Sequence, residues 1–226
     1  NVESLLVIGL AGGTIPRQYA HVYGNIPMRG IEIDPAIIEA GALFFEMNAD
    51  SLPSLQADAA DGRYALKQRD RNYSVIAIDA YRPPYIPWHL TTVEFFREVR
   101  DALTDDGVVA INVGRTPTDR RLVDALTQVM TQVFPSVYAL DVPRSFNTIL
   151  YATRQPTQSE NLAANLATLS ADASPLLRDV LTDSLGQLVA INPQGPMFTD
   201  DRAPVETLAD SLVLNFLIYG DTSQLR

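Results

Sequence analysis

The sequence predicts an α/β fold with a doubly wound, mostly parallel sheet. Short apolar runs alternate with helical segments up to about residue 150, which is the pattern of strands joined by crossover helices. The apolar runs are continuous, as expected for strands that are buried on both faces of a sheet. A glycine-rich turn follows the first run, and this placement is typical of Rossmann-like domains that bind a ligand at the carboxyl ends of the strands.

Each strand is predicted from a run of apolar or β-branched residues that ends at turn residues. The strongest run, 73–79, ends in an acid. Pro53 weakens the third strand because proline cannot donate to a ladder. The last two runs indicate a closing antiparallel pair. In chain order the predicted strands are 5–9, 28–33, 52–57, 73–79, 108–113, 137–140 and 148–152.

The segments between these strands have the spacing of helices. Pro35 stands at a favourable first-turn position of the second helix. A proline-rich loop, 80–90, precedes an amphipathic helix, and the turn at 105–107 leads into the next strand. The predicted helices are 14–23, 35–47, a short one after the turn at 58–63, 91–103 and 119–133.

Beyond residue 152 the character of the sequence changes to a polar, linker-like stretch followed by helical segments. The predicted helices here are 162–169, 176–188 and 203–219, the last with Pro204 in its first turn. We therefore divide the chain into a nucleoside-binding Rossmann-like core, 1–152, and a C-terminal helical extension, 153–226, packed on that core.

The composition bounds the class of ligand. The chain has 226 residues, no cysteine and a formal net charge of −10. Disulfides and thiolate chemistry are therefore excluded, and a nucleic-acid partner is disfavoured. The negative charge favours cationic small molecules such as amines, although it also serves solubility alone. No run approaches the roughly 20 apolar residues of a membrane span, and no signal peptide is visible, so we expect a cytoplasmic protein.

The turn after the first strand carries Gly9, Ala11, Gly12 and Gly13. Small residues here let the backbone approach a ligand and leave the N–H groups of the following helix free. The turn lacks both the Lys-Ser/Thr of a phosphate-binding loop and a Gly-x-Gly-x-x-Gly pattern. A nucleoside without phosphates therefore fits better than a dinucleotide. The alternative is a tight turn that only packs helix on strand.

Acids follow the second and third strands. Glu32 ends the second strand, where a carboxylate can accept hydrogen bonds from both ribose hydroxyls. Asp34 is either a helix N-cap or a ligand residue. Asp61 and Gly62 follow the third strand, where a carboxylate can accept a hydrogen bond from an adenine amino group. The alternative for Asp61 is a turn with an aspartate N-cap.

Asp79 ends the fourth strand and so faces the mouth of the sheet. Beside a bound nucleoside it can hold or deprotonate an amine acceptor, or it is a turn aspartate. Tyr81 and Trp88, in the loop behind it, can line a site for an amine through cation–π contact or simply pack the loop.

Neither His21 nor His89 belongs to a metal or triad pattern, and we predict no metal. His21 is expected at the surface, and His89 is a candidate proton shuttle or an ordinary structural residue.

Several of these segments together resemble the spermidine synthases, which are polyamine aminopropyltransferases. The resemblance covers about residues 5–152 and rests on the order and spacing of several motifs. A further segment, 199–206, looks like the tail of family members fused behind a membrane-embedded region. The matching motifs are Val7-Ile8-Gly9-Leu10-Ala11-Gly12-Gly13-Thr14, Gly30-Ile31-Glu32-Ile33-Asp34-Pro35, Asp61-Gly62-Arg63, Val75 to Asp79, Leu90 to Phe96, and Leu103 to Val108.

The resemblance implies a class I methyltransferase-like fold, decarboxylated S-adenosylmethionine as donor and a small amine as acceptor. It implies Glu32 on the ribose, Asp61 beside the adenine and Asp79 as the catalytic acid–base residue. Aligning the amine with the sulfonium-bound carbon would then supply much of the rate. A homodimer and fusion to an N-terminal membrane region are compatible with this resemblance.

Three departures from the family pattern keep other functions open. The aspartate that holds the donor's amine is replaced by Ala11, and the second loop aspartate by Arg82, a cation that would repel a polyamine acceptor. The family's N-terminal β-strand domain has no counterpart in this sequence, which indicates a fragment or a site open at that side.

These departures leave two alternative functions open. Ala11 and Arg82 would suit the carboxylate of S-adenosylmethionine, which would make the protein a methyltransferase. A non-catalytic nucleoside-binding domain of a membrane-attached protein is the third possibility. We predict a spermidine synthase-like transferase.

Overall fold

The computed structural model describes residues 2–80 and 86–219. Its centre is one sheet, and the sequence of each strand explains its burial: β1 and β4 are entirely apolar or small and entirely buried. The strands are β1 (Leu5–Ile8), β2 (Met28–Glu32), β3 (Leu55–Ala59), β4 (Tyr73–Ile78), β5 (Leu103–Gly114), β6 (Ser136–Asp141), β7 (Asn147–Thr153) and β8 (Leu188–Val189).

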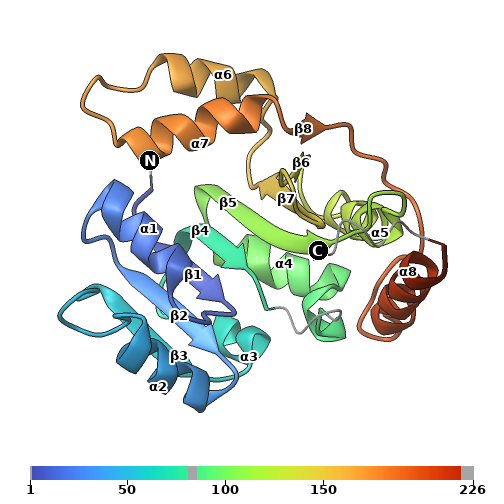
Figure 1. Ribbon diagram of the computed structural model, residues 1–226, viewed down its shortest axis with the longest axis horizontal. Coiled ribbons are helices and arrows are strands. Elements are labelled where there is room, and N and C mark those ends of the chain that lie inside the picture. The colour runs from blue at the N-terminus through green and yellow to red at the C-terminus, as the bar shows by residue number, and fades with distance from the viewer. Residues whose placement is uncertain (1, 81–85, 220–226) are drawn as a thin grey trace.

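The eight strands lie in the order β3-β2-β1-β4-β5-β7-β6-β8 (Figure 1). The first five strands pair in parallel, whereas β7 runs antiparallel to both β5 and β6. This arrangement confirms the predicted doubly wound, mostly parallel sheet with a closing antiparallel pair. Because β1 and β4 are neighbours at the point where the strand order reverses, their carboxyl ends form the crevice in which such sheets bind ligands.

Helices cover both faces of the sheet. Leu5 and Val7 pack toward α1 on one face, whereas Leu6 and Ile8 belong to the large core formed with α4 and α5 on the other. The helices are α1 (Thr14–Tyr23), α2 (Pro35–Phe44), α3 (Gly62–Lys67), α4 (Val93–Ala102), α5 (Arg121–Met130), α6 (Glu160–Ala167), α7 (Pro175–Leu185) and α8 (Val205–Tyr219), with one 3-10 turn, η1 (Trp88–Leu90).

Several predicted boundaries are wrong: the helices predicted at 91–103, 119–133 and 176–188 are Val93–Ala102, Arg121–Met130 and Pro175–Leu185. The boundaries of the third strand and the second helix have clear local reasons. The third strand begins at Leu55 because its partner β2 begins at Met28, which is in register with Leu55, and because Leu52 is buried in the preceding loop. The second helix ends at Phe44, since Glu46 has a left-handed backbone (φ 54) that a right-handed helix does not include.

Two strand features were not predicted. β5 already begins at Leu103, so the stretch 105–107 predicted as a turn is a bulge inside the strand, where the register shifts between Tyr73 and Val75 of β4. β8 is two residues long and pairs antiparallel with β6. A strand of that length leaves no periodic signal in a sequence.

The segment after residue 153 contributes both a strand and packed helices. Phe198, Val205 and Leu212 are buried in the main core, and α8 lies beside α5. In contrast, α6 and α7 lie side by side and bury no residue completely (Figure 1). The domain boundary at residue 152 stays a prediction. Within residues 2–80 and 86–219, no helix is both long and apolar enough to cross a membrane.

The ends of β1 and β4 approach each other closely at Gly9. Gly9 has a left-handed backbone (φ +89), and a Cβ there would lie 2.4 Å from the carbonyl oxygen of Asp79. The Asp79 N–H in turn donates to the carbonyl of Ile8 at 2.8 Å. Only glycine allows this approach, which sets the glycine turn directly against the residue that follows β4.

We predict that Gly9→Ala lowers the free energy of unfolding by about 2 kcal/mol more than Gly24→Ala, measured by urea unfolding. Gly24 is the matched control because it also has a positive φ (+73) but no atom within 4 Å of its added Cβ. The control therefore carries the backbone strain alone. Equal losses for the two variants would mean that the approach of β1 to β4 is not a constraint.

Candidate functional site

The glycine turn lies over the carboxyl end of β1. Ala11 has a positive φ (46) and is exposed, while Gly13 adopts a left-handed conformation (φ 75) at the N-cap of α1. A Cβ on Gly13 would lie 2.8 Å from the Met47 sulfur. The turn is held from outside by Arg17, whose guanidinium donates to the carbonyls of Gly12 and Phe45. The small residues of the turn thus allow its left-handed backbone and its close contact with Met47.

Glu32 closes the turn from the neighbouring strand. The residue is only 8 % exposed, yet its carboxylate is hydrogen-bonded on both oxygens. Oε2 accepts from the Ala11 N–H at 3.1 Å, and Oε1 accepts from the Ile33 N–H at 3.0 Å. The carboxylate therefore lies between the turn and the end of β2. Oε1 also accepts from the Asp34 N–H at 3.4 Å, so the lone pair that remains for a further donor is on Oε2.

Asp34 caps α2. Its Oδ1 accepts from the Ala36 N–H at 2.9 Å, with Pro35 at the first position of the helix. The structure thus gives Asp34 the capping role, one of the two roles that the sequence left open, and strand β2 ends before it.

Asp61 caps α3 and contacts His89. Its Oδ1 accepts from the Tyr64 N–H at 2.9 Å, and its Oδ2 lies 2.7 Å from His89 Nε2. Burial by itself raises the pKa of Asp61, but the hydrogen bonds from Tyr64 and His89 outweigh it and lower the pKa below its ordinary value. Gly62 lets α3 begin against β1, because a Cβ there would lie 2.3 Å from Ile8 Cγ2.

Asp79 follows β4 and is exposed at the same edge of the sheet. Its Oδ1 accepts from Asn112 Nδ2 at 2.9 Å. Asn112 lies on β5, and its own Oδ1 is buried without a hydrogen-bond partner. Sequence reasoning missed Asn112, although one amide in the otherwise apolar run 108–113 is a signal that could have found it.

The loop after Asp79 is only partly described. Tyr81 and Arg82, predicted to contact the substrate, lie outside the described residues. Trp88 is 43 % exposed on η1, with its ring 5.7 Å from the His89 ring in an edge-on arrangement. His21 is exposed, as predicted. The contact between His89 and Asp61 was not predicted, because nothing in the sequence pairs two loops 28 residues apart.

Arg63 ties three elements together beneath this edge. A guanidinium has five N–H donors, and all five are used here. Nε and Nη2 donate to Glu98 on α4, Nη1 and Nη2 donate to Asp200, and Nη1 also donates to the His89 carbonyl. Its side chain is only 11 % exposed. Arg63 is thus a structural cross-link with no donor left for a ligand.

The tail segment 199–206 is anchored by the same cross-link. Asp200 accepts from Arg63 and from Thr92 Oγ1, and its own N–H donates to Glu94 at 3.0 Å. The neighbouring Phe198 is fully buried, and its carbonyl accepts from the Val93 N–H. The tail therefore packs on the start of α4 and reaches the Asp61–Arg63 segment through Asp200.

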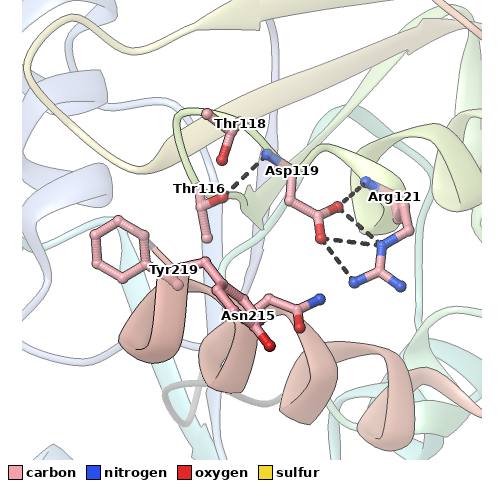
Figure 2. A pocket seen from close by; sticks show the side chains of 7 residues that line it. Thr116, Thr118, Asp119, Arg121, Asn215 and Tyr219 are labelled. Atoms are coloured by element: carbon pink, nitrogen blue, oxygen red, sulfur yellow. Dashed lines mark hydrogen bonds and ion pairs between the residues drawn. The ribbon is translucent and has the colours of Figure 1, made fainter. Parts of the chain in front are cut away.

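Two cavities lie away from this edge. The smaller, about 340 Å³, lies between the β5–α5 loop and α8 (Figure 2). The one acid among its lining residues, Asp119, is paired with Arg121 at 2.6 Å. The larger, about 710 Å³, lies between the sheet and the α6–α7 pair and is mostly apolar. Neither is lined by Glu32, Asp61 or Asp79.

The carboxyl ends of four adjacent strands carry the predicted residues in a fixed order. Along β3-β2-β1-β4 these are Asp61, Glu32, the glycine turn and Asp79. Neighbouring strands are about 4.8 Å apart, so the row from Asp61 to Asp79 spans about 14 Å. Across the described residues, no group of three or more potential ligands that could hold a metal ion occurs.

The strand order and the antiparallel β7 define an α/β fold of the methyltransferase type. The model of the spermine/spermidine synthase domain matches residues 1–161, so the chain belongs to this family. This confirms the predicted resemblance.

Among similar proteins, a probable polyamine aminopropyl transferase of Bifidobacterium longum is 30 % identical over 223 residues, with 92 % of this chain and 49 % of that protein covered. The chain thus spans about half the length of that relative. A spermidine synthase in complex with the transition-state analogue AdoDATO superimposes with a TM-score of 0.65 at 18 % identity, covering 95 % of this chain and 69 % of the other.

Human methyltransferase-like protein 13 in complex with SAH superimposes with a TM-score of 0.63 at 22 % identity, covering 92 % of this chain and 89 % of the other. Both structural likenesses show the fold.

We predict that Arg63→Met lowers the free energy of unfolding by about 2 kcal/mol at pH 7 and by much less near pH 3. Burial raises the pKa of Glu98, but hydrogen bonds from Arg63 and Lys67 lower it overall. Hydrogen bonds from Arg63 also lower the pKa of Asp200. A lowered folded-state pKa gives stability that is present above the unfolded-state pKa and is lost as the pH falls through the folded-state pKa.

Urea unfolding at pH 7, 5 and 3 measures this effect. Arg100→Met is the control, because Arg100 pairs with Asp101 at the surface. A loss in Arg63→Met that does not change with pH would contradict an electrostatic role for this cross-link.

Proposed function

We propose that the protein transfers an aminopropyl group from decarboxylated S-adenosylmethionine to a small amine. The observation that carries this proposal is the order of residues along the sheet edge: Asp61, Glu32, the glycine turn and Asp79. An extended nucleoside with a substituent on its 5′ carbon presents base, ribose and reacting carbon in the same order. The membership of the spermine/spermidine synthase domain family supports the same activity.

The nucleoside half of the donor fits the first three positions. Asp61 would accept from the adenine amino group, and Glu32 would accept from the ribose hydroxyls. Glu32 suits this role because it is buried and already oriented by the Ala11 and Ile33 N–H groups. A carboxylate fixed before the ligand arrives loses little freedom on binding.

The charges at the edge favour a cationic donor. Decarboxylated S-adenosylmethionine carries a sulfonium and an ammonium group and no carboxylate. Asp79 is exposed where the sulfonium would lie, and opposite charges attract at this range. The net charge of −10 also attracts cationic substrates to the protein.

Asp79 would act as the base. The lone pair of the neutral amine attacks the carbon bound to the sulfonium, the carbon–sulfur bond breaks, and its electrons leave on sulfur as the neutral thioether methylthioadenosine. As the carbon–nitrogen bond forms, the attacking nitrogen loses a proton to the Asp79 carboxylate, and the product is a neutral secondary amine. Asn112 would orient that carboxylate through its hydrogen bond to Oδ1. Positioning of the amine supplies most of the rate.

Transfer of a methyl group from S-adenosylmethionine is the second candidate. The turn Gly9–Thr14 contains no acid, so it offers no carboxylate to hold the donor's amine and none to repel the carboxylate of S-adenosylmethionine. The cytoplasmic setting, a homodimer and attachment to a membrane region stay predictions.

We predict that Asp79→Asn reduces transfer to a primary diamine by at least about 100-fold, because the amide cannot accept the proton. Affinity for methylthioadenosine should stay within about 2-fold, since the amide keeps the shape and the contact with Asn112 can be retained. Mass spectrometry of the alkylated amine measures turnover, and calorimetry measures affinity.

The matched control is Asp101→Asn, an exposed acid at the far end of α4. It should leave both quantities unchanged. Full activity of Asp79→Asn would remove Asp79 from the mechanism, and a methylated product would assign the methyltransferase activity instead.

A further inference from the structure

Asp61 is held by two elements that follow different strands. One carboxylate oxygen caps α3 through the Tyr64 N–H, and the other lies 2.7 Å from His89 Nε2. His89 belongs to η1, in the connection that follows β4, whereas Asp61 follows β3. The two segments are not adjacent in the sheet order, because β2 and β1 lie between their strands. The turn η1 nevertheless packs beside α3, so the His89 side chain meets the Asp61 carboxylate from a neighbouring element.

His89 is itself fixed at both ends. Its carbonyl accepts from Arg63 Nη1 at 3.2 Å, and Arg63 is held in turn by Glu98 and Asp200. Its ring packs edge-on against Trp88. Because an ionised carboxylate can only accept, the proton on His89 lies on Nε2 and points at Asp61. An imidazole held in this way determines the side-chain orientation of Asp61.

We propose that His89 is a positioning residue that aims the Asp61 carboxylate at the amino group of adenine and so sets the preference for adenine over purines without that group. The assignment rests on the proposed function, in which Asp61 lies beside the base. The carboxylate accepts from the Tyr64 N–H, from His89 and from the Arg63 backbone, which leaves one of its four lone pairs for the ligand. Without His89 the carboxylate keeps only its cap contacts at the start of α3, so Oδ2 is no longer held in place and the geometry of the ligand contact is lost.

The experiment compares two nucleosides by calorimetry: methylthioadenosine and its analogue that lacks the 6-amino group. Wild-type protein should prefer methylthioadenosine by about 10-fold or more, as for a hydrogen bond to a charged group. In His89→Ala this ratio should fall to about 3-fold or less. His89→Gln should keep most of the ratio, because its side-chain amide can donate to Asp61. The ratio cancels any general loss of binding that a merely structural change would cause.

The control is His21→Ala, which removes the other histidine, an exposed one on α1. Its ratio should equal that of wild type. Should His89→Ala fail to fold, His89→Asn replaces it, because its shorter side chain cannot reach Asp61. An unchanged ratio in the variants that lack the contact, with both nucleosides still bound, would overturn the role of His89 alone. Binding of neither nucleoside by wild-type protein would overturn the proposed function and this assignment together.

Discussion

The close approach of β1 to β4 at Gly9 is the constraint on which the site depends. A Cβ at this position would collide with the backbone of Asp79 and Ala80. The glycine turn can therefore lie against the residue after β4 only because position 9 has no side chain. The hydrogen bond from the Asp79 N–H to Ile8 fixes the same junction. As a result, the acid proposed as the base and the turn proposed to hold the donor share one rigid corner of the sheet. Rigid placement of this kind is what a reaction governed by alignment requires.

Hydrogen bonds and ion pairs of buried charged side chains connect this corner of the sheet to the neighbouring strands, helices and tail. Glu32 joins β2 to the glycine turn through the Ala11 N–H, and Arg63 joins α3 to α4, to η1 and to the C-terminal tail through five N–H donors. Both side chains are largely buried, and a charge in that position is stable only when it is hydrogen-bonded or paired, as both of these are. The tail beyond β8 is therefore more than an appendage, because Asp200 supports the segment that carries Asp61.

The fold and the positions of the site residues were predictable from local sequence, whereas the contacts between loops were not. Continuous apolar runs predicted the buried strands, and an acid at the end of a run predicted Glu32 and Asp79 at the sheet edge. The cap formed by Asp34 was one of two roles that the sequence left open, and the structure shows it. The hydrogen bond of His89 to Asp61 and that of Asn112 to Asp79 arise from tertiary packing, and no periodicity encodes them. The bulge in β5 and the two-residue β8 were missed because pairing across strands, not propensity, creates them.

Calorimetric titration of the protein with decarboxylated S-adenosylmethionine and with S-adenosylmethionine tests the central claim most directly. The site, with its exposed Asp79 and a net charge of −10, should bind the decarboxylated donor more tightly, because that molecule has no carboxylate to be repelled. Tighter binding of S-adenosylmethionine would contradict aminopropyl transfer and favour methyl transfer. Binding of neither donor would contradict the assignment of this sheet edge as a nucleoside site.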